Sequence, residues 1–137
     1  IWAHEHGPRG GDEINIITAG KNYGWPVISY GINYNGTKFT DISEKEGMEQ
    51  PVHQWTPSIA PSGMTFVTSD KYPDWQGHLL VGSLKFNNLE LVKLDGSKIL
   101  SVDKVQEGIG RVRNVVQLSD GFIYVATDGE GIYRINP

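Results

Sequence analysis

The first thirty residues contain a set of oxygen donors that suits a hard cation. Gly7-Pro8 and Gly10-Gly11 are turn-forming pairs, and they shape the backbone so that carbonyl oxygens can point at one centre. Asp12 and Glu13 add two carboxylates directly after this turn. Carbonyl and carboxylate oxygens are the ligands that calcium prefers. A tight turn followed by two solvated acids explains the same residues equally well, so the spacing alone leaves both interpretations open.

A second group of candidate residues is cationic. Arg111 and Arg113 are two positions apart, so on a strand their side chains lie on the same face, about 6–7 Å apart along the backbone. Two such cations repel each other unless an anion lies between them, and arginine binds planar carboxylates through two parallel hydrogen bonds. Lys85 follows an apolar run over 79–81, where a lone lysine is usually a surface residue. From the residues alone, the three cations are either solvated or part of an anion-binding site.

Short β-strands separated by turns must position these residues. The apolar alternation predicts strands over 13–18, 64–68, 77–83, 88–94, 98–105, 111–118, 122–127 and 131–135. Asp95-Gly96 and Asp120-Gly121 are hairpin-turn signals. Helical periodicity is weak, and only 70–76 is compatible with a helical turn. We therefore expect an all-β chain with two antiparallel meanders, roughly 64–105 and 111–135.

Composition excludes several classes of protein. The chain has 137 residues, 38% of them hydrophobic, and a net charge of −4, which is typical of a globular protein with a modest core. Its lysines and arginines are scattered, so nucleic acid is not expected as a partner. No apolar run approaches the roughly 20 residues that span a membrane. There are no cysteines, which rules out disulfides and thiolate metal sites.

Five motifs occur in one collinear order over nearly the whole chain. They are HEHGPRGGDEIN with GKNYGWP at 4–26, PSIAPSGM at 57–64, VGSLK at 81–85, GRVRNV at 110–115 and SDGFIYVATD at 119–128. Together they resemble the soluble aldose sugar dehydrogenases that depend on pyrroloquinoline quinone (PQQ), the glucose/sorbosone dehydrogenase family. That family is longer than this chain, which resembles its C-terminal part.

The resemblance implies part of a single six-bladed β-propeller domain. Within it, 1–29 corresponds to the calcium and cofactor signature, and 30–63 to a long loop on the active-site face. Residues 64–105 and 106–137 correspond to two four-stranded antiparallel meanders, each a blade. A partial ring exposes strand edges and apolar faces. We therefore expect the remainder of the propeller, or a second copy of the chain, to cover them.

The resemblance also implies the site residues. Lys85, Arg111, Arg113 and Ser58 match cofactor-binding positions. The carbonyls of Gly7 and Pro8 match ligands of the calcium ion that accompanies the cofactor. Glu13 and the carbonyl of Tyr23 match ligands of a second, structural calcium, to which Asp12 is a further candidate. His6 matches a polar position that lines the sugar pocket. Trp55 is a candidate wall of the same pocket, with simple packing as its alternative.

The implied activity is oxidation of an aldose at its anomeric carbon to a lactone, with hydride transfer to PQQ and electrons passed on to an external acceptor. The family's general-base histidine lies upstream of the signature. This chain would then hold no catalytic residue and be inactive alone. A periplasmic or secreted location is expected by the same resemblance. Two alternatives remain, a non-catalytic propeller that binds a partner and a calcium-dependent lactonase-like propeller. Three cations suited to one anionic cofactor favour the dehydrogenase.

Overall fold

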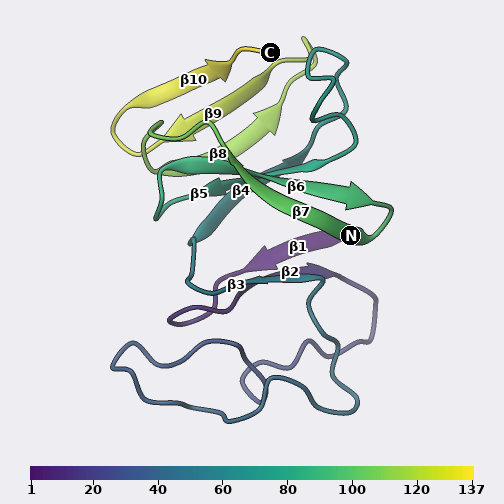
Figure 1. Cartoon of the computed structure of the whole chain (residues 1–137), viewed down its shortest axis with the longest axis vertical. Coiled ribbons are helices and arrows are strands. Elements are labelled where there is room, and N and C mark those ends of the chain that lie inside the picture. Colours follow the sequence, from purple (N-terminus) through teal and green to yellow (C-terminus); the bar gives the residue numbers. More distant parts are fainter. The chain divides into compact units, whose positions relative to one another are not determined.

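The computed structural model describes residues 1–137 and contains ten β-strands and no helix, which confirms the all-β prediction (Figure 1). Two compact units divide the chain, Ile1–Ala60 and Pro61–Pro137. No helix has the length and hydropathy needed to cross a membrane.

The first unit contains a small antiparallel sheet. Its strand order is β1 (Trp2–Glu5), β2 (Asp12–Ile16) and β3 (His53–Trp55). The central strand β2 is the most buried, because the side chain of Ile14 is fully covered. The long segment between β2 and β3 contains no strand and is tied back by an isolated bridge between Arg9 and Ile32. β3 lies inside the region that the sequence predicts to be a loop over 30–63, and it was not predicted.

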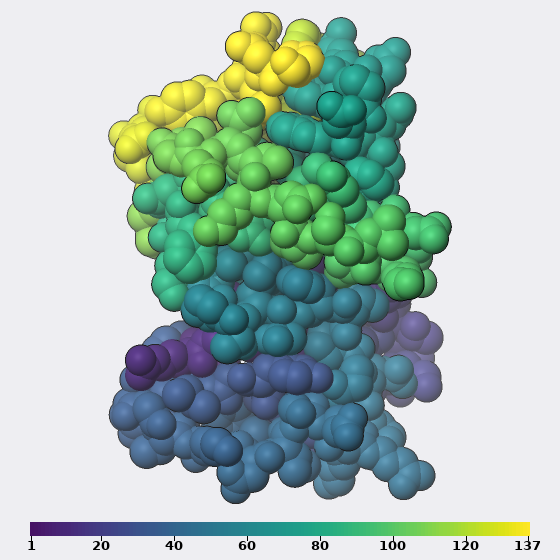
Figure 2. Space-filling view, in the orientation of Figure 1, coloured from purple at the N-terminus to yellow at the C-terminus, as the bar shows by residue number.

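The second unit begins with a four-stranded antiparallel meander. Its strands follow in chain order, β4 (Pro61–Phe66), β5 (Leu79–Ser83), β6 (Asn88–Asp95) and β7 (Lys98–Val105). Every residue of β5 is buried, as its continuous apolar sequence predicts. Asp95 pairs with Lys98 across the predicted Asp-Gly hairpin turn. β7 is the outer strand, and its green residues lie at the surface of this unit in Figure 2.

A three-stranded sheet completes the second unit. It has the order β10 (Gly131–Ile135), β9 (Ile123–Thr127) and β8 (Val112–Gln117). The family resemblance implies four strands over 106–137, but this part of the chain forms three, and they are those that the apolar alternation predicts at 111–118, 122–127 and 131–135. The register of β8 against β9 shifts between Val112 and Asn114, which places a bulge at Arg113.

The core of the second unit lies where the two sheets face each other. Its buried residues are Val67, Tyr72, Leu80, Leu89, Leu91, Val112, Val115, Ile123, Val125 and Ile135. Gly63 of β4 permits the close approach of β8, because a Cβ atom there would lie 2.2 Å from the backbone nitrogen of Val115. Packing against β4 therefore fixes β8, at whose start Arg111 and Arg113 lie.

The segment from Asp70 to Gly77 forms hydrogen-bonded turns and no helix. A single bond spanning four residues joins the amide of Gln76 to the carbonyl of Tyr72 at 2.9 Å. The Tyr72 hydroxyl donates to the carbonyl of Ile135 at 2.6 Å and accepts from the amide of Ile123 at 3.0 Å. Tyr72 thus anchors this turn to β9 and β10.

Candidate functional site

In the first unit, Asp12 holds the loop between β1 and β2. The carboxylate is fully buried, and the amide of Gly7 donates to Oδ1 at 2.9 Å. Oδ2 accepts a bond from the Ser58 hydroxyl at 2.5 Å and one from the Ala60 amide at 2.9 Å. A buried carboxylate is tolerated when several donors satisfy it. Asp12 and Ser58, which the family resemblance implies as calcium and cofactor residues, are therefore bonded to each other and shape the loop.

Gly7 lies in the tightest part of this loop. A Cβ atom at this position would lie 2.1 Å from the carbonyl oxygen of Gly10, so no larger residue fits without moving backbone. The loop is also anchored from outside, because the amide of Gly11 donates to the carbonyl of Trp55 at 2.8 Å. The carbonyls of Gly7 and Pro8 are not acceptors in the hydrogen bonds of the loop. They are oxygens with spare acceptor capacity on a rigid turn.

Two glutamates lie opposite each other beside the loop. Glu5 of β1 pairs in register with Glu13 of β2, and the side-chain amide of Asn15 donates to Glu5 at 2.9 Å and to Glu13 at 3.2 Å. Burial raises the pKa of Glu13; the Asn15 hydrogen bond opposes this effect, and the charge of Glu5 adds to it. Like charges directly opposite in a sheet are destabilising. Two carboxylates held together by one amide are a place where a cation would be stabilising.

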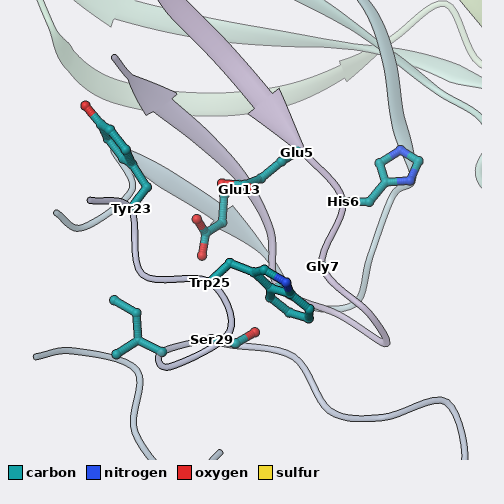
Figure 3. A pocket seen from close by; sticks show the side chains of 9 residues that line it. Glu5, His6, Gly7, Glu13, Tyr23, Trp25 and Ser29 are labelled. Carbon is teal, nitrogen blue, oxygen red and sulfur yellow. The ribbon is translucent and has the colours of Figure 1, made fainter. Parts of the chain in front are cut away.

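These glutamates line a small hollow of the first unit (Figure 3). Its lining residues are Glu5, His6, Gly7, Gly11, Glu13, Tyr23, Trp25, Ile28 and Ser29. The cavity volume of about 20 Å³ is enough for one ion or one water molecule and too small for an organic cofactor. The Tyr23 hydroxyl is anchored away from the hollow, donating to the carbonyl of Ile16 at 2.8 Å. The imidazole of His6 points away from Glu13.

Trp55 is 7% exposed, and the edge of its ring system meets His53 with the ring centroids 4.6 Å apart. Burial also lowers the pKa of His53. The environment of Trp55 within the first unit is thus that of a packing residue.

In the second unit, Arg111 and Arg113 share one carboxylate. Nε of Arg113 donates to Oδ1 of Asp128 at 2.6 Å, and Nε of Arg111 donates to Oδ2 at 3.2 Å. The hydrogen bond from Arg113, together with that from Arg111, lowers the pKa of Asp128. Buried Val112 separates the two arginines, whose side chains are about half exposed. Both guanidinium groups therefore lie on the solvent face, one on each oxygen of the same carboxylate.

Lys85 lies in the turn between β5 and β6, directly after Leu84. Nη1 of Arg111 donates to the carbonyl of Leu84 at 3.2 Å, which joins this turn to the start of β8. The Lys85 ammonium lies 5.1 Å from the centre of the Phe86 ring and makes no ion pair with a carboxylate. Asp128 thus pairs with two arginines, and a third cation lies in the turn that Arg111 contacts; such an excess of positive charge favours an anionic ligand.

Sequence reasoning missed three residues of these sites, namely Glu5, Asn15 and Asp128. A signal for two of them was present in the hairpins. Pairing residues outward from the Asp120-Gly121 turn of the β8–β9 hairpin brings Asp128, the residue after β9, close to Arg111. The amide of Asp128 does donate to the Arg111 carbonyl at 2.9 Å. Counting outward from the glycine-rich loop similarly brings Glu5 opposite Glu13.

Known proteins match this chain over almost its full length. The family described as Glucose / Sorbosone dehydrogenase matches residues 1–134. The aldose sugar dehydrogenase YliI of Escherichia coli K12 is 46% identical over 131 residues, which cover 93% of this chain and 35% of that protein. The chain therefore spans about a third of that relative's length.

Solved structures agree with the sequence matches. A crystal structure of a glucose dehydrogenase superposes with a TM-score of 0.94 at 39% identity, covering 99% of this chain and 41% of that one. The PQQ-bound aldose sugar dehydrogenase of Streptomyces coelicolor gives a TM-score of 0.67 at 28% identity, covering 95% of this chain and 35% of that one. The antiparallel meanders described above are the blades of a β-propeller. By motif order, family match and structure, the chain belongs to the glucose/sorbosone dehydrogenase family.

Proposed function

We propose that this chain supplies cofactor- and calcium-binding residues of a PQQ-dependent aldose sugar dehydrogenase. The observation that carries the proposal is the arginine pair on the carboxylate of Asp128, which Arg111 joins through the Leu84 carbonyl to the turn that holds Lys85. A propeller that binds a partner without redox chemistry has no need of three cations on one small surface. Relatives named aldose sugar dehydrogenase, one of them with PQQ bound, support the same assignment.

The cationic cluster fits the chemistry of PQQ, a planar quinone with three carboxylates. Arg111 and Arg113 have terminal nitrogens left for a ligand, and guanidinium groups bind carboxylates through paired hydrogen bonds. Lys85 adds a compact positive charge that no carboxylate neutralises. Ser58, by resemblance, is a further cofactor-binding residue, and its hydroxyl is bonded to Asp12. When bound, PQQ supplies the quinone that accepts hydride.

Calcium belongs to the proposal through the oxygens of the first unit. The carbonyls of Gly7 and Pro8 would hold the ion that accompanies the cofactor. Glu13 and the carbonyl of Tyr23 would hold a second ion. The small hollow beside Glu13 suits one hard cation. Asp12 supports this set mainly by holding the amide of Gly7, because both of its oxygens already accept protein hydrogen bonds.

The proposed reaction oxidises the anomeric carbon of an aldose to a lactone and passes the electrons to an external acceptor. His6 would line the sugar pocket, whereas Trp55 is buried as a packing residue. The general base would be a histidine outside this chain, so the chain alone would be inactive. The protein would act in the periplasm or outside the cell, with the remainder of the propeller or a second copy covering the exposed strand edges.

The test is titration of the full-length calcium-loaded apoprotein with PQQ, followed by the absorbance of the cofactor. A charge-assisted hydrogen bond contributes roughly 1.5–3 kcal/mol, so alanine at Lys85, Arg111 or Arg113 should each weaken PQQ binding about tenfold to a hundredfold. Lys104→Ala is the matched control, because its ammonium also lies over the Phe86 ring, at 5.0 Å. Wild-type affinity in all three alanine variants would contradict the proposal. PQQ-independent lactone hydrolysis by the wild type would favour the lactonase alternative.

A further inference from the structure

Asp128 occupies an unusual position for an acid beside a proposed anion site. Its two oxygens each accept a hydrogen bond from the Nε atom of a different arginine, Arg113 at 2.6 Å and Arg111 at 3.2 Å. One short side chain thereby spans the pair. Asp128 follows directly after β9, and its amide is fixed to the carbonyl of Arg111 at 2.9 Å, so the carboxylate has a defined place at the end of the sheet.

The contacts of Asp128 leave particular edges of the two guanidinium groups available. Asp128 takes only the Nε hydrogens. Nη1 of Arg111 donates to the carbonyl of Leu84 at 3.2 Å, and the terminal nitrogens of Arg113 make no hydrogen bond to protein. A guanidinium group binds a carboxylate best through two parallel donors. Arg113 therefore presents its outer pair of nitrogens to solvent in an orientation that its Nε bond fixes.

The charge of Asp128 and its contacts with the arginines should affect anion affinity in opposite directions. A carboxylate near a bound anion repels it, so removal of Asp128 should strengthen anion binding if Asp128 acts only as a charge. Arginine side chains have many rotamers, and immobilising each of them on binding costs affinity. The bulge at Arg113 also leaves its backbone without a regular ladder partner, and the hydrogen bond that holds its side chain is the one to Asp128. The two effects have opposite signs and can be separated by experiment.

We propose that Asp128 is a positioning residue, which holds Arg111 and Arg113 with their outer nitrogens directed at the carboxylates of the cofactor. The inference rests on the proposed function, because it assumes that the arginine pair binds PQQ. In this role Asp128 touches the arginines and not the cofactor. The gain from ordering two flexible cations exceeds the repulsion between Asp128 and the bound anion.

The experiment measures the affinity of full-length calcium-loaded apoprotein for PQQ by absorbance titration. Asp128→Asn keeps the shape and removes the charge, and we expect it to weaken PQQ binding about fivefold to fiftyfold. Asp128→Glu restores the carboxylate and should recover part of that loss. Asp103→Asn is the matched control, because Asp103 lies on β7 and also pairs with an exposed cation, Lys93, at 3.4 Å. The PQQ affinity of this variant should equal that of the wild type. Melting temperatures verify that each variant is folded.

A double-mutant cycle separates positioning from other effects. When Arg111 and Arg113 are both alanine, Asp128→Asn should no longer weaken PQQ binding. Unchanged or tighter binding in Asp128→Asn, with the arginines intact, would overturn the positioning role. If the arginine variants themselves bind PQQ like the wild type, the proposed function fails, and this inference fails with it. Should Asp128→Asn not fold, Asp128→Ser takes its place, because it also removes the carboxylate that holds the arginines; wild-type affinity in that variant would overturn the role.

Discussion

At the scale of single residues, two carboxylates that are neighbours in the sequence have different environments. Asp12 is buried and accepts three protein hydrogen bonds, whereas Glu13, the next residue, shares one amide with Glu5 and lines a hollow. Alternation along β2 explains the difference, because consecutive residues of a strand point to opposite faces. Asp12 is therefore satisfied by the protein, and Glu13 has the capacity to bind a cation.

Replacement of Glu13 tests the structural calcium. Glu13→Gln exchanges an anionic ligand for a neutral amide, so we expect weaker calcium binding and a smaller rise in melting temperature when calcium is added to the full-length protein. In the wild type, calcium at about 100 times its Kd should stabilise the fold by about 2.7 kcal/mol. Thermal denaturation across calcium concentrations measures both quantities. Glu44→Gln, at an exposed loop position, is the control, and a calcium response equal to the wild type in Glu13→Gln would assign Glu13 to the turn alone.

The raised pKa of Glu13 gives a pH dependence with a defined sign. Its value in the folded protein lies above the ordinary 4.5, so the ionised form costs stability in the calcium-free protein at neutral pH. That cost should be relieved as the pH falls through the folded-state pKa towards 4.5, while calcium binding weakens over the same range because protons compete for the carboxylate. Melting temperatures of calcium-free wild type and Glu13→Gln, compared between neutral pH and 4.5, should converge on acidification. A difference that is independent of pH would show that Glu13 does not titrate in this way.

At the scale of elements, other strands fix the start of β8, where Arg111 and Arg113 lie. Val112 and Val115 are buried in the core of the second unit, so the residues between and before them face solvent. Ser62 of β4 donates to the Val112 carbonyl at 2.7 Å, which ties the start of β8 to the neighbouring sheet. The arginines therefore owe their common face to the burial of the valines around them.

The contact between β4 and β8 predicts a sensitive position. Gly63→Ala would place a methyl group 2.2 Å from the backbone nitrogen of Val115, so one strand must move. Overpacking of this kind costs about 1–3 kcal/mol. We expect a lower denaturation midpoint in the full-length protein and weaker PQQ binding through the displaced arginines. Thr65→Ala on the same strand should change stability by less than about 0.5 kcal/mol, and equal midpoints for the two variants would contradict the close packing.

At the scale of the whole chain, the sequence predicted the strands well and the partners poorly. Alternation and Asp-Gly turns located the strands of the second unit, because those signals are local. β3 is only three residues long, too short for a pattern, and it forms because β2 offers it an edge. Asp128 and Glu5 depend on hairpin register, which a single bulge or loop shifts by a residue. The residue types of the sites were readable from the sequence, but the contacts that orient them were not.

Our proposal that the full-length protein is a working sugar dehydrogenase can be tested through the redox state of its bound cofactor. Full-length protein reconstituted with PQQ and calcium would be mixed with an aldose in the absence of oxygen and of any other electron acceptor, and its absorption spectrum recorded. We expect the cofactor to convert to its reduced spectrum, with one lactone formed per PQQ bound. A bound cofactor whose spectrum stays oxidised with every aldose tested, and no lactone formed, would contradict it.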